Sequence, residues 1–142
     1  MSGVDASNDG QALARLQEEM RRPPLHAFLA PQALAVIAES GEVIIRLPFR
    51  EEFRRDPVED GYHGGILAAL IDLAGHAAVA VKTGKPAPTI DLRIDYLRPA
   101  PSVDLEARAR VLRAGRAIAR ADIEVMANGV LVAVGRGTFS TL

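Results

Sequence analysis

The stretch HGGILAALIDLAGHAAVAVK, residues 63–82, decides the fold. From Ile66 to Val81 almost every residue is apolar, so a helix over about 64–82 has no polar face to turn toward water. Such a helix is buried, and the sequence TGKP at 83–86 ends it. One apolar helix needs a sheet curved around it. The stretch therefore predicts an α+β fold in which an antiparallel sheet covers one long central helix.

The chain before this helix predicts a helix and a hairpin. A narrow apolar stripe of Leu13, Leu16 and Met20 indicates an amphipathic helix, which Pro23-Pro24 ends. Ser40-Gly41 separates two strand-like runs and is typical of a hairpin turn. The expected elements are a disordered tail over 1–10, a helix over about 11–22, a short turn over 25–30, strands over 33–39 and 42–48, and a charged loop over 49–62. We expect a single domain over 11–142.

The chain after the helix has the pattern of antiparallel strands. Apolar and polar residues alternate through 88–98, which predicts one covered and one exposed face. The apolar positions are Ile90, Leu92, Ile94 and Tyr96, and the polar positions are Thr89, Asp91, Arg93 and Asp95. Strands over 103–113, 116–127 and 130–139 follow, and Asn128-Gly129 is a strong hairpin signal. We expect these four strands to pair in chain order as a meander.

The composition excludes several classes of function. The 142 residues are 49% hydrophobic, 25% charged and 4% aromatic, with a net charge of -1 and no Cys. The lack of Cys excludes disulfides and thiolate chemistry, and the near-neutral charge argues against a nucleic-acid binder. Because Met1–Gly10 is polar and Asp72 and His76 interrupt the apolar helix, we expect neither a signal peptide nor a membrane span. The expected location is the cytoplasm.

Asp72 and His76 are the two titratable residues between Ile66 and Val81. They lie four residues apart and so share one helix face. Burying a carboxylate on an apolar helix costs several kcal/mol unless it is paired or hydrogen-bonded. One explanation is a structural Asp–His pair or a bond to the backbone. The other is a functional carboxylate, because apolar surroundings are where functional pKa shifts occur.

The sequence His63-Gly64-Gly65 begins the same helix. A helix N-terminus has unpaired N–H groups and a positive dipole end, and glycine lets a ligand approach that backbone closely. Such amides can form an oxyanion hole, although the same residues also suit an ordinary loop-to-helix junction. Gly64 and Asp72 are separated by roughly 12 Å of helix rise. If both serve one site, two antiparallel copies of the helix must meet across a two-fold axis, which predicts a homodimer with two equivalent sites.

The last strands are rich in arginine. Most of these side chains are expected on a solvated face among acidic neighbours, but a few can hold phosphates, because the guanidinium group suits them. The candidates are Arg98, Arg113 and Arg116. No P-loop, dinucleotide-binding glycine motif or nucleophile elbow occurs. The three His residues show no metal-ligand spacing, so neither a metal nor another cofactor is expected.

Four segments together resemble the hotdog-fold acyl-CoA thioesterases, most closely the phenylacetic-acid-pathway branch that is called PaaI-like. They are HGGILAALIDLAGHAA (63–78), TIDLRIDYLRPAP (89–101), RAGRAIARADIEV (113–125) and NGVLVAVGRGTF (128–139). The resemblance covers about residues 25–140. It implies a sheet wrapped around one helix, dimers that often pair into tetramers, and an acyl-CoA substrate at the dimer interface.

The resemblance also implies roles for individual residues. Asp72 matches the catalytic carboxylate, Gly64 the glycine whose N–H polarises the thioester carbonyl from the opposite subunit, and His63 the histidine beside it. Gly65 and His76 are then expected near the substrate. One position departs from the family, because many members have Asn or Gln six or seven residues before the histidine. Here those positions are Pro57 and Asp56.

The resemblance predicts hydrolysis of an acyl- or aryl-CoA thioester, with Asp72 as general base or as nucleophile. Two alternatives stay open at this point. One is an acyl-CoA-binding or regulatory module without turnover, which the missing Asn or Gln favours. The other is a hotdog dehydratase or hydratase that uses Asp72 and His76.

Overall fold

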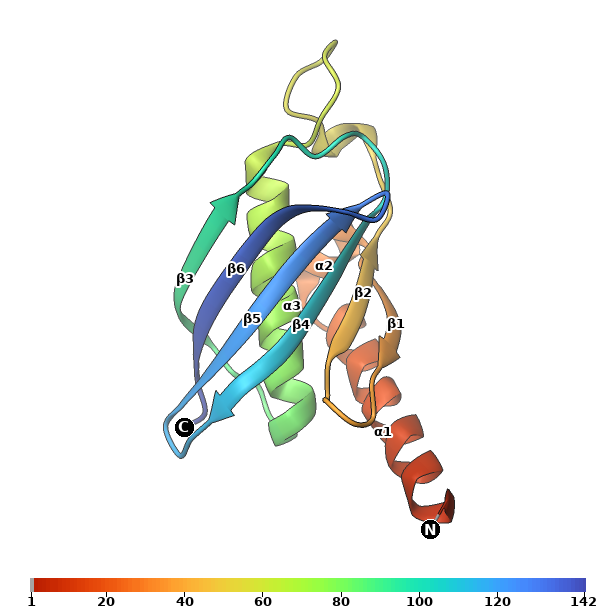
Figure 1. The fold of residues 1–142 in the computed structure, drawn as a ribbon, viewed down its shortest axis with the longest axis vertical. Coiled ribbons are helices and arrows are strands. Elements are labelled where there is room, and N and C mark those ends of the chain that lie inside the picture. The colour runs from red at the N-terminus through yellow and green to blue at the C-terminus, as the bar shows by residue number, and fades with distance from the viewer. Residues whose placement is uncertain (1) are drawn as a thin grey trace.

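A six-stranded antiparallel sheet curves around one long helix, as Figure 1 shows for the computed structural model. The structure describes residues 2–142, with side chains from residue 10 onward. The elements are α1 (Ser2–Arg21), α2 (Pro24–Leu29), β1 (Gln32–Val36), β2 (Val43–Leu47), the 3₁₀ helix η1 (Glu51–Phe53), α3 (Gly64–Thr83), β3 (Thr89–Tyr96), β4 (Leu105–Ala114), β5 (Ile118–Ala127) and β6 (Val130–Ser140). The predicted α+β hotdog arrangement is confirmed.

The central helix α3 is the core of the molecule. Its residues from Leu70 to Val81 are buried except Asp72 and His76, which are partly exposed. The helix packs tightly on β6, because a β-carbon at Gly135 would lie 2.4 Å from Cγ2 of Ile71. By length and composition alone α3 could cross a membrane, with a mean hydropathy of 1.8, but 61% of that stretch is buried inside the fold.

The strand order in the sheet is β1-β2-β4-β5-β6-β3. The prediction of a four-strand meander is therefore wrong for β3, which pairs with β6 at the far edge and not with β4. Residues 97–104 cross over the ends of β6 and β5, a distance of three strand spacings or about 14 Å. Backbone bonds hold this link, because Leu97 N–H donates to Val132 O and Tyr62 N–H donates to Ala100 O. A segment with Pro99 and Pro101 suits this extended path better than a tight turn.

A bulge in β3 changes which side chains face the helix. Thr89 pairs with Phe139, but Leu92 pairs with Gly137, so the register shifts between Thr89 and Asp91. The extra residue places Thr89 on the same side as Leu92, facing α3. Ile90, predicted on the covered face, is instead 59% exposed.

The remaining local predictions are confirmed with small changes of boundary. The hairpin of β1 and β2 forms, and the turn between β5 and β6 has positive φ at Asn128 (50°) and Gly129 (75°), as a type I′ turn requires. The first helix is longer than predicted. It begins at Ser2, so residues 2–10 continue α1 where the sequence predicts a disordered tail. Met1 lies outside the described residues.

Candidate active site

Asp72 lies halfway along α3, on the side that faces β3. Its carboxylate is partly exposed, and Oδ1 accepts a hydrogen bond of 2.6 Å from the Thr89 hydroxyl. The structural explanation for Asp72, a direct bond to His76 or to the backbone, does not apply, because its partner is a side chain on β3. The second oxygen, Oδ2, makes no hydrogen bond within the described part of the chain. A carboxylate held from one side and open on the other suits acid–base or nucleophilic chemistry.

His76 is one turn further along α3, with 22% of its side chain exposed. Its Nε2 accepts the Ala87 N–H at 3.2 Å, so the ring is neutral and has its proton on Nδ1. That Nδ1 faces the Glu19 carboxylate of α1 at 3.7 Å. Burial lowers the pKa of His76, although Glu19 acts in the opposite direction. Both ring nitrogens therefore face protein groups, which leaves no nitrogen free to contact a substrate.

At the N-terminus of α3, one backbone amide is available. The His63 side chain caps the helix, because its Nδ1 accepts the Gly65 N–H at 2.8 Å, and the His63 carbonyl accepts the Ile66 N–H at 2.9 Å. Among the hydrogen bonds of residues 2–142, none takes up the Gly64 N–H. The cap thus leaves Gly64 as the open donor at the positive end of the helix dipole.

A surface hollow adjoins this open amide. Gly64, Tyr96, Leu97 and Arg98 line it together with the neighbouring loop residues. The Tyr96 hydroxyl donates to the Gly64 carbonyl at 2.8 Å, which holds the peptide that follows the open amide. Arg98 has no ion pair with any described carboxylate, and its guanidinium is available to an anion here. Among the predicted arginines, Arg98 is the one that the fold brings to Gly64.

Within one chain, Gly64 and Asp72 do not meet. Both lie on α3, and about 12 Å of helix rise separates them. Gly65, Ala68 and Asp72 form a partly exposed strip along α3 at the edge of the sheet, beside β3. The edge of β3 beside this strip is also free in the single chain, because β3 pairs only with β6.

The loop before α3 has a defined structure. The Asp56 Oδ1 accepts the N–H groups of Val58 (2.8 Å) and Glu59 (2.9 Å), and these bonds lower the pKa of Asp56. Arg54 donates to the carbonyls of Val58 and Glu59 from the other side. Asp56 and Pro57 therefore build a turn, and neither of them takes the place of the amide side chain that many family members have.

Arg113 and Arg116 lie at the hairpin between β4 and β5. Arg113 pairs directly with Arg120 across the two strands, and like charges placed so are destabilising unless an anion joins them. The three guanidinium groups line a shallow hollow and make no ion pair with a described carboxylate. The register places them near the row of Thr89 and Phe139, but on the sheet face turned away from α3. The hairpin is thus far from Gly64 of the same chain.

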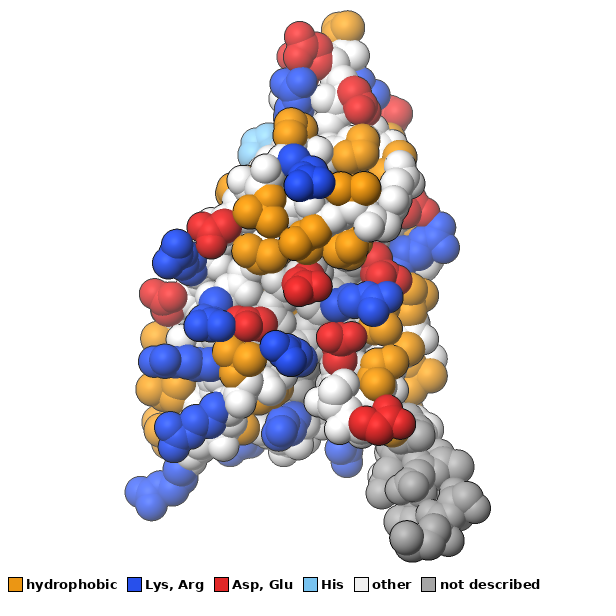
Figure 2. Space-filling model, in the orientation of Figure 1, with side chains coloured by type: hydrophobic (Ala, Val, Ile, Leu, Met, Phe, Trp, Pro, Cys, Tyr) orange, Lys and Arg blue, Asp and Glu red, His pale blue; other side chains and the backbone are white. Residues whose placement is uncertain are grey.

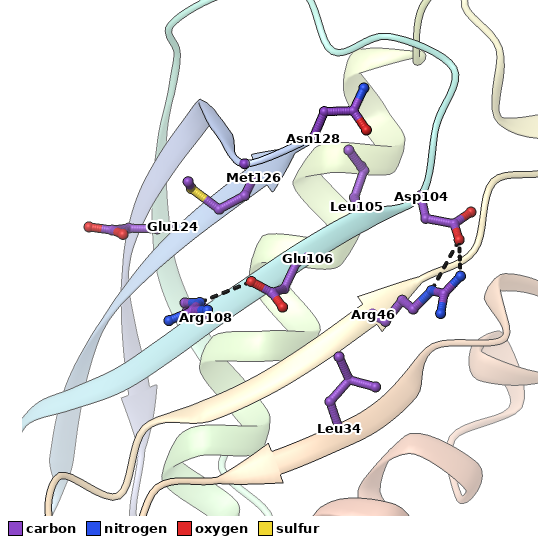
Figure 3. A pocket seen from close by; sticks show the side chains of 10 residues that line it. Leu34, Arg46, Asp104, Leu105, Glu106, Arg108, Glu124, Met126 and Asn128 are labelled. Carbon is purple, nitrogen blue, oxygen red and sulfur yellow. Dashed lines mark hydrogen bonds and ion pairs between the residues drawn. The ribbon is translucent and has the colours of Figure 1, made fainter.

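The outer face of the sheet otherwise carries interspersed basic and acidic side chains, as Figure 2 shows. A hollow on this face, drawn in Figure 3, lies over β2, β4 and β5. Its arginines are neutralised, because Arg46 pairs with Asp104 and Arg108 with Glu106. The arginines of this hollow are therefore not available to a substrate phosphate, and the one charged lining side chain without an ion pair to a described residue is the acidic Glu124. No cluster of metal-ligating side chains occurs among residues 2–142 whose side chains are described.

Sequence reasoning missed two residues of this site, Thr89 and Tyr96. Strict alternation placed Thr89 on the polar face with Asp91, and the bulge reverses this. Tyr96 was predicted on the apolar face, but its contact with Gly64 depends on how β3 lies beside α3. The Thr-x-Asp-Leu sequence at 89–92 was the one available signal.

An antiparallel sheet wrapped around one long helix defines the hotdog class of fold, and this chain adds a mid-helix carboxylate and an open glycine amide at the helix start. The family model of the thioesterase superfamily matches residues 62–133, which include both ends of this site. The chain belongs to the thioesterase superfamily, and its function is of the thioesterase type.

Individual relatives agree with this assignment. A protein of Halobacterium salinarum that is named as an esterase is 39% identical over 98% of this chain and 96% of its own length. The crystal structure of a protein from the thioesterase superfamily has a TM-score of 0.86 at 36% identity, over 92% of this chain and 98% of that one. The phenylacetic acid degradation protein PaaI of Thermus thermophilus has a TM-score of 0.73 at 31% identity, over 84% of this chain and 100% of that one.

Proposed function

We propose that the protein hydrolyses an acyl- or aryl-CoA thioester to the free acid and CoA. The observation that carries this proposal is the Asp72 carboxylate, held by Thr89 on an otherwise apolar helix whose first amide is open at Gly64. The carboxylate supplies the reacting group, and the amide supplies a donor for the oxygen that becomes negative. Such a donor lowers the barrier by about 3–4 kcal/mol when it is preorganised.

The reaction needs two copies of the chain, because about 12 Å separates Gly64 from Asp72 along one helix. We propose that a second copy packs antiparallel against the partly exposed strip of α3 and along the free edge of β3. The small residues Gly65 and Ala68 and the exposed side chains of Ile90 and Tyr96 support this surface. Gly64 of one copy then faces Asp72 of the other, and the dimer has two equivalent sites.

Two routes are compatible with this geometry. As a general base, Asp72 takes a proton from water while the water oxygen attacks the thioester carbonyl. The C–S bond then breaks, and the CoA thiolate takes up the proton. As a nucleophile, Asp72 attacks the carbonyl itself, releases the thiolate and forms an anhydride that water cleaves. In both routes, the Gly64 N–H of the other copy receives the oxyanion.

A dehydratase fits this site less well. Elimination across a β-hydroxyacyl chain needs a histidine nitrogen free to act with the acid, whereas Nε2 of His76 accepts the Ala87 N–H and Nδ1 faces Glu19. The binding module remains the outcome to test, because Asp56-Pro57 offers no amide side chain to hold a water.

The test is release of free CoA, followed with a thiol-reactive dye over aryl, short, medium and long acyl-CoAs. Because the chain has no Cys, it adds no thiol signal of its own. We expect turnover on at least one ester and a loss of about 10²–10⁴-fold in kcat for Asp72→Asn. Asp91→Asn, on the outer side of β3, is the matched control and keeps wild-type activity. Saturable binding without turnover on any ester would replace the thioesterase with a binding module.

We further propose that the unpaired arginines hold the phosphates of CoA. The candidates are Arg113 and Arg116 at the hairpin and Arg98 beside Gly64. Replacing Arg113 and Arg116 by Gln should raise KM for a CoA ester but leave an N-acetylcysteamine ester, which has no phosphates, unchanged. Arg136→Gln is the control, because Arg136 pairs with Asp122. An equal change in KM for both esters would mean that the hairpin arginines do not bind the phosphates. We also propose that the protein acts in the cytoplasm.

A further inference from the structure

The side chain of His76 ties the turn between α3 and β3 back to α3, at a point beyond the contact of the Thr83 hydroxyl with the Lys85 carbonyl. Nε2 of His76 accepts the Ala87 N–H at 3.2 Å, and Ala87 is fully buried. Two residues later, the Thr89 hydroxyl donates to Asp72, which is one helical turn before His76. His76 and Asp72 thus hold two points of the same short segment, 87–89, against one helix face.

The ring of His76 is itself held from the other side. Its Nδ1 faces Oε2 of Glu19 at 3.7 Å, and that carboxylate, only 14% exposed, is also 3.2 Å from the Arg22 guanidinium. Glu19 lies in the last turn of α1 and Arg22 directly follows that helix, which packs on α3 through Leu16 and Met20. The neutral tautomer with its proton on Nδ1 is favoured by the carboxylate and leaves Nε2 as the acceptor for Ala87.

We infer that His76 is a positioning residue for the reaction, because it anchors the 84–88 turn so that the Thr89 hydroxyl stays on Asp72. This inference rests on the proposed function, in which Asp72 reacts. It also assigns α1 a part in the site, since Glu19 orients the ring. His76 itself contacts no reacting atom in this role, which differs from the substrate contact that the family resemblance implies for it.

The anchor depends on the charge of His76. A proton on Nε2 removes the acceptor that Ala87 needs. The groups that face the ring are Glu19, Arg22, His26 and Asp72. Burial lowers the pKa of His76, and Arg22 and His26 act in the same direction, whereas Glu19 and Asp72 raise it. The neutral acceptor therefore persists to a pH below the usual range of histidine.

The test compares two substitutions of similar size. His76→Gln places an amide oxygen near the Nε2 position and can still accept the Ala87 N–H. His76→Leu fills the space but accepts nothing. We expect His76→Leu to lower kcat about three- to tenfold with little change in KM, and His76→Gln to restore most of that loss. His76→Gln should also lack the part of the acid-side decline in kcat that protonation of His76 causes.

A double-mutant cycle separates positioning from a general structural role. In a Thr89→Val background, His76→Leu should have no further effect on kcat, because the hydroxyl that His76 positions is absent. Additive losses, or an equal loss for His76→Gln and His76→Leu, would overturn the inference. So would an unchanged kcat in His76→Leu while Asp72→Asn is inactive.

A readout without turnover distinguishes this inference from the proposed function. By NMR, His76→Leu should speed hydrogen exchange of the Ala87 amide and average the Thr89 side-chain rotamer, whereas His76→Gln should preserve both. If Asp72→Asn kept full activity, the thioesterase proposal would fail, while these two signals would still test the anchor. Unchanged exchange and an unchanged Thr89 rotamer in His76→Leu would show that no anchor exists.

Discussion

The two sides of α3 differ in how much space surrounds their glycines. Where the helix meets the sheet, a β-carbon on Gly135 would lie 2.4 Å from Ile71, and one on Gly75 would lie 2.7 Å from the Phe139 ring. On the open side, a β-carbon on Gly64 would meet nothing closer than the Tyr96 hydroxyl at 3.5 Å. The first two glycines let backbone and side chains pack closely, whereas the third leaves a surface for something outside the chain. We therefore expect substitutions on the sheet side to change stability and substitutions on the open side to change turnover.

The largest expected effect on the open side beyond Asp72 is at Thr89. Thr89→Val keeps the shape and removes the hydrogen bond to the carboxylate, so kcat should fall by about 10- to 100-fold, as expected for a bond of 1.5–3 kcal/mol to a charged group. Urea unfolding should show a much smaller change than the rate does.

Thr89→Ser keeps the hydroxyl and is the matched control for this prediction. It should retain most of the activity. A loss in Thr89→Ser as large as that in Thr89→Val would mean that the methyl group and its packing, not the hydrogen bond, support the reaction.

On the sheet side, Gly135→Ala should destabilise the fold by about 1–3 kcal/mol, because the new methyl group overlaps the buried, branched Ile71. The activity of each folded molecule should change little. Gly10→Ala is the contrasting control, since nothing lies within 4 Å of a β-carbon there and alanine favours the helix α1 by about 1 kcal/mol. If the melting temperature changed in the same direction in both variants, close packing at Gly135 would not explain the result.

Gly64→Ala tests the open side with the same substitution. The fold should be unaffected, because the new methyl group makes only ordinary contacts with Tyr96. The methyl group enters the hollow beside the open amide, so kcat/KM should fall about tenfold, which is about 1.4 kcal/mol. Full activity in Gly64→Ala would show that no substrate approaches this part of the backbone.

The smallest expected effect is the pH dependence of stability. Because the pKa of His76 is lowered in the folded state, its contribution is complete above about 6.5 and is lost as the pH falls through the folded value. The denaturation midpoint should therefore decrease as the pH is lowered from 7.5 to 5, and it should decrease less in His76→Gln. Asp104 and Asp122 do not contribute to this decrease, because both stay ionised in this pH range. The Phe49 N–H lowers the pKa of Asp104, and the Arg136 side chain lowers the pKa of Asp122. An equal fall in both proteins would assign the effect to another group.

Local signals in the sequence were sufficient for the central helix and for the hairpins. The helix was predicted over about 64–82 and is observed at Gly64–Thr83, because its apolar run and its glycine stop act within the segment itself. The position of β3 in the sheet was not predictable in this way. Its partner β6 is the third strand after it in the chain. The alternation of apolar and polar residues in a strand is the same whichever strand lies beside it, so this pattern does not reveal the partner.

For the site, Gly64 and Asp72 were predictable because each is unusual for its place on an apolar helix. Thr89 was not, because one extra residue in β3 exchanges the two faces of that strand. The contacts of His76 with Ala87 and Glu19 also depend on distant elements that no spacing reveals. The sequence therefore indicated these two candidate residues, whereas their surroundings depend on the tertiary structure.

The edge position of β3 has a consequence for the order in which the protein matures. The strand that carries Thr89 pairs in the sheet with β6 alone, and β6 is synthesised after β3, β4 and β5. A nascent chain that already contains Asp72, Gly64 and Thr89 therefore has the parts of the site but no template to align them. The alignment of the Thr89 hydroxyl with Asp72 therefore requires β6 to be present, so we expect a chain that stops before Val130 to contain these residues without their hydrogen bond.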